Sequence, residues 1–222
     1  MSSAIHDLLG QSQEDSSIKG DFPLDKNVID QLPEGTKVLS ADRYGSSAWT
    51  VTARITTELA DGTPKKYFLK CAAEDGGQAM MEGEFWAITE LHKTIPANIP
   101  KPIARGKFDK GSPATYFFLT EFIDMSDQAP DPNRLCSTIV DLHRNSVSPT
   151  GKFGFHVRTC NGRTPQATEW DNSWTSFFAK FMKHVLAEDV KTNGTWAELE
   201  KFGQRTVDLV IPRLIGALEV RF

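Results

Sequence analysis

The chain has 222 residues, of which 39% are hydrophobic and 24% charged, and its formal net charge at pH 7 is -4. This composition is typical of an ordered globular protein of one or two domains. A small negative charge without a clustered basic face argues against a nucleic-acid partner. Residues 1–30 are mostly polar, so we expect a flexible segment there. They contain neither the apolar core of a signal peptide nor a membrane-spanning run, so we expect a cytoplasmic protein without a membrane partner.

Four strands are expected in the first half of the chain. Residues 49–55 alternate apolar and polar side chains, which is the period of a half-buried strand. Asp61-Gly62 turns the chain, and residues 67–71 read as the returning strand of a hairpin. A helix then separates this hairpin from two further strands, at residues 103–108 and 115–122.

The second half of the chain predicts helices. Asp131-Pro132 is a helix start, because Asp caps the first turn and Pro is tolerated there. A stronger helix is indicated by an apolar stripe at three- and four-residue steps, expected to pack against a core. Its members are Trp174, Phe177, Phe178, Phe181, Met182, Val185 and Leu186. Thr195 and Glu198 form a capping box that opens the final helix, and Pro212 should bend or end it.

The three cysteines, Cys71, Cys136 and Cys160, are odd in number and far apart. This pattern favours reduced thiols over a disulfide set or a zinc site.

The predicted elements follow the order of a protein-kinase-like fold: strands, one helix, two further strands and then helices. We therefore expect an α/β (α+β) protein. Its small lobe, with an antiparallel sheet and one helix, would occupy residues 31–124, and the first part of a helical large lobe residues 125–222.

Lys70 interrupts an otherwise apolar strand. A strand lysine commonly extends its charge to water, but it can also serve as a fixed positive charge for ATP phosphates. In the next helix Glu84 lies at the edge of the inward-facing side. An unpaired carboxylate facing a core is costly, and in the kinase-like arrangement its cationic partner is the strand lysine, so we predict that Glu84 pairs with Lys70.

Two other segments stand where a nucleotide would bind. Gly45, Ser46 and Ser47 precede the first hairpin, where small residues let backbone N–H groups and hydroxyls approach phosphates. They lack the G-x-G-x-x-G spacing, and an ordinary turn is the commoner interpretation. Glu121 and Ile123 stand at the expected lobe junction, where the carbonyl of the first and the N–H of the second would pair with adenine; an exposed strand end explains them equally well.

His143-Arg144-Asn145 and Lys152-Phe153-Gly154 imitate the H-R-D and D-F-G motifs of protein kinases with both acids replaced. We reject a pseudokinase, because Thr150 stands where those motifs require an Asn and the two triplets are almost adjacent. His143 instead continues the stripe of its helix and is predicted to be packed or capping. No spacing of His, Asp and Glu suggests a metal site.

Several segments together resemble the fructosamine kinase / ketosamine-3-kinase family, in the form of a fungal-like protein-ribulosamine 3-kinase. They are Lys70, residues 82–84, 119–121, 142–143, 153–155, 159–162 and 165–166, and above all residues 170–178. The resemblance extends from residue 38 to residue 218 and is most specific in its second half. It implies a protein-kinase-like fold related to aminoglycoside phosphotransferases.

The resemblance also implies an activity. The ATP γ-phosphate would pass to the sugar 3-hydroxyl of ketosamines on glycated proteins, with Mg²⁺ as second cofactor and protein deglycation repair as the outcome. Ribulosamines and erythrulosamines are the expected substrates, with fructosamine a lesser one. Lys70 would bind phosphate and Glu84 would orient it, while Glu121 and Ile123 would hold adenine.

The family continues into a His-Gly-Asp-x-Trp-x-x-Asn catalytic loop and an Asp-Pro metal site, and the sequence ends at Phe222 before either. We therefore expect no catalytic residue or metal ligand in residues 1–222, which alone should be inactive and poorly soluble. If they were active alone, Asp141 and Asp171 would be the first candidates for the base.

Two non-enzymatic functions are alternatives. One is a non-catalytic remnant that binds nucleotide or glycated protein. The other is a plain interaction module without nucleotide, which would require Lys70 and Glu84 to be unpaired.

Overall fold

The computed structural model describes residues 18–45 and 47–218. The chain forms two compact units, Met1–Asn145 and Ser146–Phe222, which we call unit 1 and unit 2. The division between them falls after the first helix of the predicted large lobe. Within the described ranges, no helix is both long enough and apolar enough to cross a bilayer.

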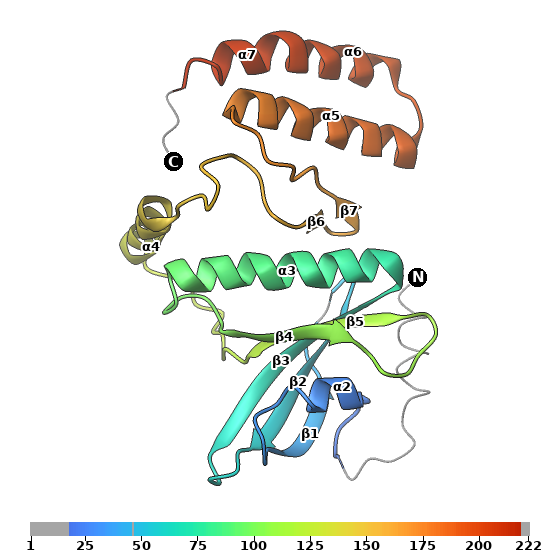
Figure 1. Ribbon diagram of the computed structural model, residues 1–222, viewed down its shortest axis with the longest axis vertical. Helices are drawn as coiled ribbons and strands as arrows, with labels where there is room; N and C mark the ends of the chain where they lie inside the picture. The colour runs from blue at the N-terminus through green and yellow to red at the C-terminus, as the bar shows by residue number, and fades with distance from the viewer. Residues whose placement is uncertain (1–17, 46, 219–222) are drawn as a thin grey trace. The chain divides into compact units, whose positions relative to one another are not determined.

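Unit 1 is built on an antiparallel five-stranded sheet (Figure 1). Its strands are β1 (Lys37–Arg43), β2 (Val51–Glu58), β3 (Pro64–Ala73), β4 (Pro102–Lys107) and β5 (Thr115–Glu121), in the order β1-β2-β3-β5-β4. The predicted hairpin is β2 and β3, and Asp61 stabilises its turn by accepting the Thr63 N–H at 2.9 Å. The four predicted strands are confirmed.

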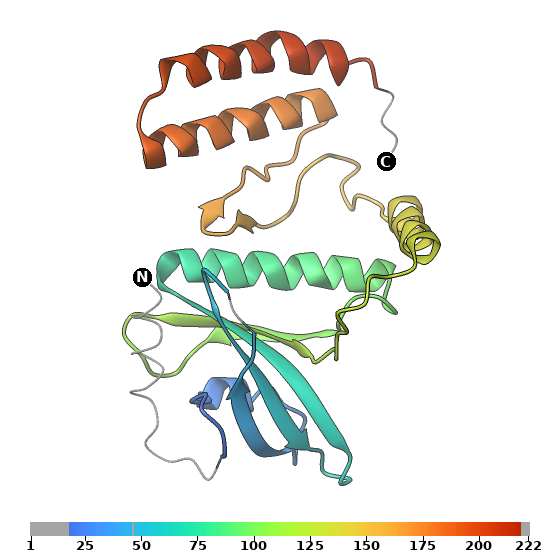
Figure 2. The same ribbon diagram turned by 180° about the vertical axis from the view of Figure 1, so that it is seen from behind.

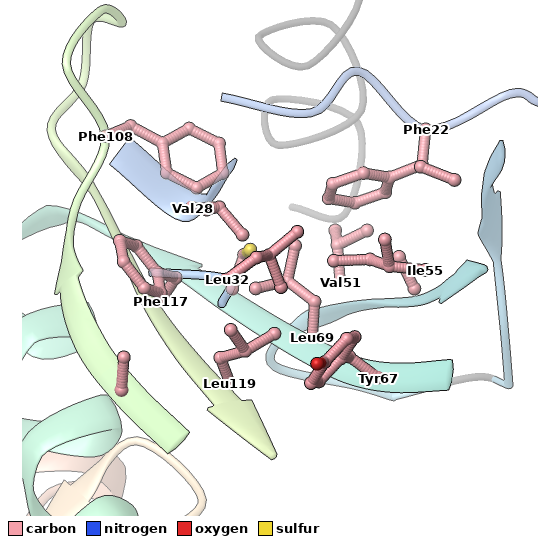
Figure 3. Packing of buried hydrophobic residues seen from close by; sticks show 14 residues of the cluster. Phe22, Val28, Leu32, Val51, Ile55, Tyr67, Leu69, Phe108, Phe117 and Leu119 are labelled. Carbon is pink, nitrogen blue, oxygen red and sulfur yellow. The ribbon is translucent and has the colours of Figure 1, made fainter. Parts of the chain in front are cut away.

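The main core lies on one face of this sheet. Alternate residues of β2 and β3 point to that face and are fully buried (Figure 3). Phe22, Val28 and Leu32 cover them from the N-terminal side, where the short helix α2 (Lys26–Ile29) is capped by Asp25. The predicted polar, flexible segment 1–30 is therefore corrected from residue 18 onward, because apolar side chains among the polar ones complete this core. Residues 1–17 lie outside the described residues.

The opposite face of the sheet is covered by α3 (Glu74–Thr94), as Figures 1 and 2 show from two sides. Met81 of α3 is 1% exposed and packs with Ala72 and Phe118 of the strands. The half-buried Phe85 and Ile88 extend this second cluster along the helix. The two faces of β3 therefore serve different cores, and α3 is fixed over the face that carries Lys70.

Helix α4 (Pro132–Asn145) begins as predicted, since the Asp131 carboxylate accepts the Arg134 N–H at 2.9 Å. Within the described part of the chain, none of its residues is buried. The packed alternative for His143 is wrong, because this side chain is exposed, while the capping alternative stays a prediction for a histidine in the last turn of α4. Apolar spacing predicted the helix correctly, but it does not show whether another element covers the apolar side.

Unit 2 starts with a long loop containing the short strands β6 (Cys160–Asn161) and β7 (Thr164–Pro165). A helical pair follows: α5 (Trp174–Asn193), then α6 (Ala197–Arg205), the π-helical turn η1 (Thr206–Val210) and α7 (Ile211–Leu214). Gly203 is buried where α6 meets α5, and a Cβ there would lie 2.7 Å from a methyl carbon of Leu186. A larger residue at this position would require the Leu186 side chain to shift.

Two details of unit 2 differ from expectation. The capping box is wrong: Trp196 precedes the first helical residue and no side chain caps α6, so Glu198 lies at the second helical position rather than the third. Pro212 does not break the helix abruptly. A π turn precedes it, in which the Ile211 N–H donates to the Thr206 carbonyl. The wider turn accommodates the proline ring, and the helix ends at Leu214.

The apolar stripe of α5 is only partly covered. Its members are half-buried, except Val185, which is 41% exposed. At the start of the helix the rings of Trp174, Phe177 and Phe178 pack together with Phe153 of the preceding loop. The stripe therefore forms a local aromatic cluster instead of a fully buried core.

Candidate functional site

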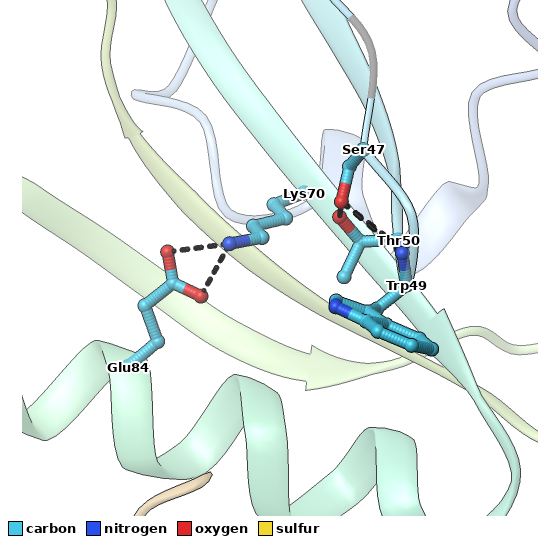
Figure 4. A network of polar contacts seen from close by, with 5 residues as sticks. All are labelled: Ser47, Trp49, Thr50, Lys70 and Glu84. Atoms are coloured by element: carbon cyan, nitrogen blue, oxygen red, sulfur yellow. Dashed lines mark hydrogen bonds and ion pairs between the residues drawn. The ribbon is translucent and has the colours of Figure 1, made fainter. Parts of the chain in front are cut away.

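The predicted ion pair between Lys70 and Glu84 is confirmed. The Lys70 ammonium donates to both carboxylate oxygens of Glu84, at 2.9 and 2.8 Å (Figure 4). The two side chains are 24% and 33% exposed, so the pair lies at the edge of the α3 cluster and remains open to solvent. An ammonium group has three donors. With two of them on Glu84, one remains for an anion.

Both partners of this pair are held by packing. Lys70 lies between Thr52 of β2 and Phe118 of β5 in the sheet register. On α3, Met81 is buried, and the Phe85 ring meets the Phe118 ring edge to face at 6.1 Å. These contacts fix the rotation of α3 that directs Glu84 toward Lys70.

The loop before β2 is shaped by a hydroxyl. Ser47 Oγ accepts the Thr50 hydroxyl at 2.8 Å and the N–H groups of Thr50 and Trp49 at 3.3 and 3.4 Å. Gly45 has φ of 78°, a conformation that favours glycine. Ser46 lies outside the described residues. Ser47 therefore stabilises the turn as an acceptor, while its own proton takes no part in these contacts.

Trp49 was expected to be the first inward residue of the strand. Instead β2 begins at Val51, and the Trp49 side chain is 51% exposed. The alternation of apolar and polar residues extends to Trp49, but strand pairing begins only at Val51. Alternation alone does not show where pairing with the neighbouring strand ends.

The predicted adenine segment follows the last residue of β5. The Glu121 carbonyl accepts the Thr120 hydroxyl at 3.0 Å, which leaves it a second lone pair. The Ile123 side chain is 47% exposed, and its N–H has no hydrogen-bond partner in the described part of the chain. A donor and an acceptor therefore lie two residues apart, and their pairing with adenine stays a prediction.

Sequence reasoning missed a contact that joins this segment to the loop. The rings of Tyr44 and Phe122 meet edge to face at 5.0 Å, and the Arg54 guanidinium lies 5.5 Å from the centre of the Tyr44 ring. Tyr44 directly precedes Gly45 of the loop, and Phe122 lies between Glu121 and Ile123 of the adenine segment. No local pattern relates two residues so far apart in the sequence, so only the folded sheet brings them together.

The two candidates for a general base differ in surroundings. Asp171 accepts from the Lys180 ammonium at 2.5 Å, the Ser173 N–H at 2.9 Å and the Ser176 hydroxyl at 2.7 Å. These donors, the Lys180 contact foremost, hold the pKa of Asp171 well below its usual range. Such a carboxylate is a weak base and serves instead to anchor the start of α5. Asp141 is exposed on α4.

Other titratable groups give no second site. All three cysteines are free, and burial raises the pKa of the Cys71 thiol, which keeps it neutral. Across residues 18–45 and 47–218, no three His, Cys, Asp or Glu side chains lie together in a way that could hold a metal ion. The candidate site is therefore the surface around Lys70, the loop and the end of β5.

Comparisons with known proteins agree with this fold. Two solved structures described as fructosamine-3-kinases are similar in fold: one from Thermobifida fusca has a TM-score of 0.62 at 21% identity over 83% of this chain and 60% of its own. The other, from Haemophilus somnus, has a TM-score of 0.59 at 19% identity over 78% of this chain and 55% of its own. Both support the kinase-like arrangement of sheet and helices.

Two curated relatives are each 26% identical to the chain. The chloroplastic protein-ribulosamine 3-kinase of Oryza sativa subsp. indica matches over 142 residues, 64% of this chain and 40% of the relative. The ketosamine-3-kinase of Mus musculus matches over 178 residues, 70% of this chain and 56% of the relative. The chain thus spans about half the length of these proteins.

A family model decides the assignment. The fructosamine kinase model matches residues 41–213, which cover most of both units and the whole candidate site. The resemblance first indicated by residues 170–178 is confirmed, and the chain belongs to the fructosamine kinase family.

Proposed function

We propose that the protein of which these residues form part phosphorylates the 3-hydroxyl of protein-bound ketosamines, chiefly ribulosamines and erythrulosamines. The observation that carries this proposal is the Lys70–Glu84 pair, in a chain of this family, with Lys70 Nζ 2.8 Å from the Glu84 carboxylate. In kinases such a pair holds the phosphates of the nucleotide. Removal of the sugar adduct from damaged proteins would be the biological outcome.

The residues of the site fit ATP. Lys70 has a donor to spare for a phosphate oxygen, and Glu84 holds the ammonium in place. Gly45 and Ser47 stand in the loop that would cover the phosphates, and Ser46 is proposed to join them. The Glu121 carbonyl and the Ile123 N–H would hold the adenine edge. ATP, when bound, supplies the phosphoryl group that is transferred.

Two roles have no residue here. The His-Gly-Asp-x-Trp motif, which would accept the hydroxyl proton and help to bind Mg²⁺, does not occur in residues 1–222. We propose that these groups belong to the remaining part of the family fold. Mg²⁺ would then act as in other kinases, by neutralising charge on the phosphates.

The two non-enzymatic alternatives make different demands on Lys70 and Glu84. A plain interaction module would require unpaired Lys70 and Glu84, and the 2.8 Å contact between them contradicts that expectation. A remnant that binds nucleotide without catalysis would use the same pair and would differ in the absence of turnover. A cytoplasmic location remains our proposal; the rice relatives are named chloroplastic.

Kinetics of the complete protein test the function. With ATP, Mg²⁺ and ribulosamine-bearing lysozyme, Lys70→Met should lower kcat/KM about 100-fold or more, since a preorganised charge that positions the α- and β-phosphates of ATP is lost. Glu84→Gln should have a smaller effect in the same direction. Lys37→Met, an exposed lysine at the start of β1, is the control and should leave kcat/KM unchanged.

Two results would contradict the proposal. One is phosphorylation of free sugars or aminoglycosides in preference to ketosamine lysines. The other is full activity of Lys70→Met. Binding of ATP by the wild type without any turnover on ketosamine substrates would favour the non-catalytic alternative.

A further inference from the structure

Trp49 is the largest exposed side chain of the loop that precedes β2, at 51% exposure. Ser47 fixes this part of the loop by accepting the N–H groups of Trp49 and Thr50 and the Thr50 hydroxyl. Thr50, the next residue, is only 7% exposed. This half-exposed indole lies beside an anchored turn and is not a member of the core cluster of unit 1, so its ring is available to a ligand.

The strand register places Trp49 relative to the nucleotide. Along β3, Tyr67 pairs with Glu121 of the adenine segment, Lys70 with Thr52, and Cys71 with Val51. Three residues of a strand extend about 10 Å. The chain therefore passes from the adenine segment to Lys70 and then to the end of β2 that carries Trp49.

The adenine segment, Lys70 and Trp49 follow one another along the sheet in the order in which the parts of the two substrates would lie. Adenine, the phosphates held by Lys70 and the acceptor of the terminal phosphate would follow one another in the same direction. Figure 4 shows the Trp49 indole on the side of the sheet that faces α3, where Lys70 reaches Glu84. Trp49 thus stands beyond the phosphates, at the end where an acceptor has to enter.

The acceptor has a chemistry that suits an indole. A ketosamine joins a sugar to the nitrogen of a lysine side chain, and this secondary amine is a cation when protonated. Cations are attracted to the face of an aromatic ring, and tryptophan is the strongest of the aromatic partners. A free sugar has no such charge.

We propose that Trp49 is a specificity-determining residue, whose indole face receives the protonated amine of the ketosamine. The inference rests on the proposed function and extends it to the recognition of the acceptor. Trp49 would distinguish ketosamines from free ketoses through its contact with the amine. Lys70 and the adenine segment would bind the nucleotide in the same way with either acceptor.

The test compares variants of the complete protein on two acceptors. Trp49→Leu keeps an apolar side chain without the ring, and Trp49→Phe keeps a weaker ring. Trp196→Leu, at a tryptophan of 61% exposure in unit 2, is the matched control. The acceptors are ribulosamine-bearing lysozyme and free ribulose, and KM is measured for each acceptor and for ATP.

For Trp49→Leu we expect the KM of the ribulosamine acceptor to rise about fivefold or more, with ATP KM changed by less than about twofold. The preference for ribulosamine over ribulose should fall by the same factor. Trp49→Phe should lie between wild type and Trp49→Leu. The control Trp196→Leu should match the wild type in all of these values.

Failure of this inference differs from failure of the proposed function. If the wild type does not phosphorylate ribulosamine, both are overturned. If the wild type is active but Trp49→Leu keeps its KM and its preference, only the inference is overturned. The same holds if Trp49→Leu merely lowers the melting temperature, because the indole then has a packing role. If Trp49→Leu does not fold, the KM values of Trp49→Phe decide in the same way.

Discussion

At the scale of single residues, Asp171 is a charged group of unit 2 with several partners. Its carboxylate accepts from Lys180, Ser173 and Ser176, and its side chain is 10% exposed. Lys180 above all holds the pKa of Asp171 below its usual range in the folded state. A carboxyl whose pKa is lowered on folding stabilises the fold above its ordinary pKa, and this contribution is lost as the pH falls toward the folded-state pKa.

We therefore predict that Asp171→Asn lowers the urea midpoint of unfolding at pH 7. Its difference from the wild type should shrink as the pH falls below about 4, where the carboxyl of the unfolded chain becomes protonated. Asp141→Asn, at an exposed position on α4, is the control and should behave as the wild type throughout. An Asp171→Asn deficit that stays constant from pH 7 to pH 3 would contradict the electrostatic explanation.

Individual residues were predictable where their neighbours in sequence define a face. Lys70 interrupts an apolar strand and Glu84 lies at the edge of the inward side of a helix, so their pairing followed from the kinase-like order of elements and the cost of an unpaired charge. Trp49 was misassigned, because periodicity alone does not show that pairing with β3 stops at Val51. Tyr44 and Phe122 have no sequence signal at all, because their contact depends on how β1, β2, β3 and β5 pair.

At the scale of elements, the loop of unit 2 depends on a glycine. Gly154 has φ of 143°, and a Cβ there would lie 2.8 Å from the Thr168 carbonyl oxygen and 2.9 Å from the Trp170 Cα. The neighbouring Phe155 donates its N–H to the Thr168 carbonyl at 2.8 Å, so the two segments cannot separate without loss of this bond.

Gly154→Ala should therefore destabilise unit 2 by about 2–4 kcal/mol, through backbone strain and a backbone clash together. Gly151→Ala is the matched control: φ is 63° there, but nothing lies within 4 Å of a Cβ, so the cost should be about 1 kcal/mol. Urea unfolding followed by tryptophan fluorescence measures both. Equal destabilisation by the two variants would show that crowding at Gly154 is not significant.

Helix starts were predictable to different degrees. Asp131-Pro132 is a strong signal, and the Asp131 carboxylate does cap α4. The capping box at Thr195 was wrong by one residue, since α6 starts at Ala197 after an extended Trp196. Helix boundaries depend on which residue leaves the helical conformation, and tertiary contacts can shift that position by a residue without changing the apolar pattern.

At the scale of the whole molecule, the two units differ in how much they bury. Unit 1 has apolar clusters on both faces of its sheet. In unit 2 the described buried apolar side chains are Val207 and Ile211. Cooperative protection from hydrogen exchange follows buried contacts, so the units should differ in local stability.

We predict that backbone amides of β2, β3 and β5 exchange slowest, and that those of α4 and of unit 2 exchange faster by about 100-fold or more. Hydrogen-exchange mass spectrometry of the native protein measures this directly, with the unfolded chain as the reference for intrinsic rates. Protection of α4 equal to that of β3 would show that its apolar side is covered in solution.

The sequence by itself determined the strands at β2 to β5, the start of α4, the Lys70–Glu84 pair and the family. Each depends on local periodicity, on a capping residue or on a motif, and these are properties of neighbouring residues. The tertiary structure alone decided that residues 18–32 complete the core, that Tyr44 meets Phe122, and that Trp49 stays exposed beside the anchored turn. These depend on which distant segments meet and where their pairing ends, and no local pattern contains that information.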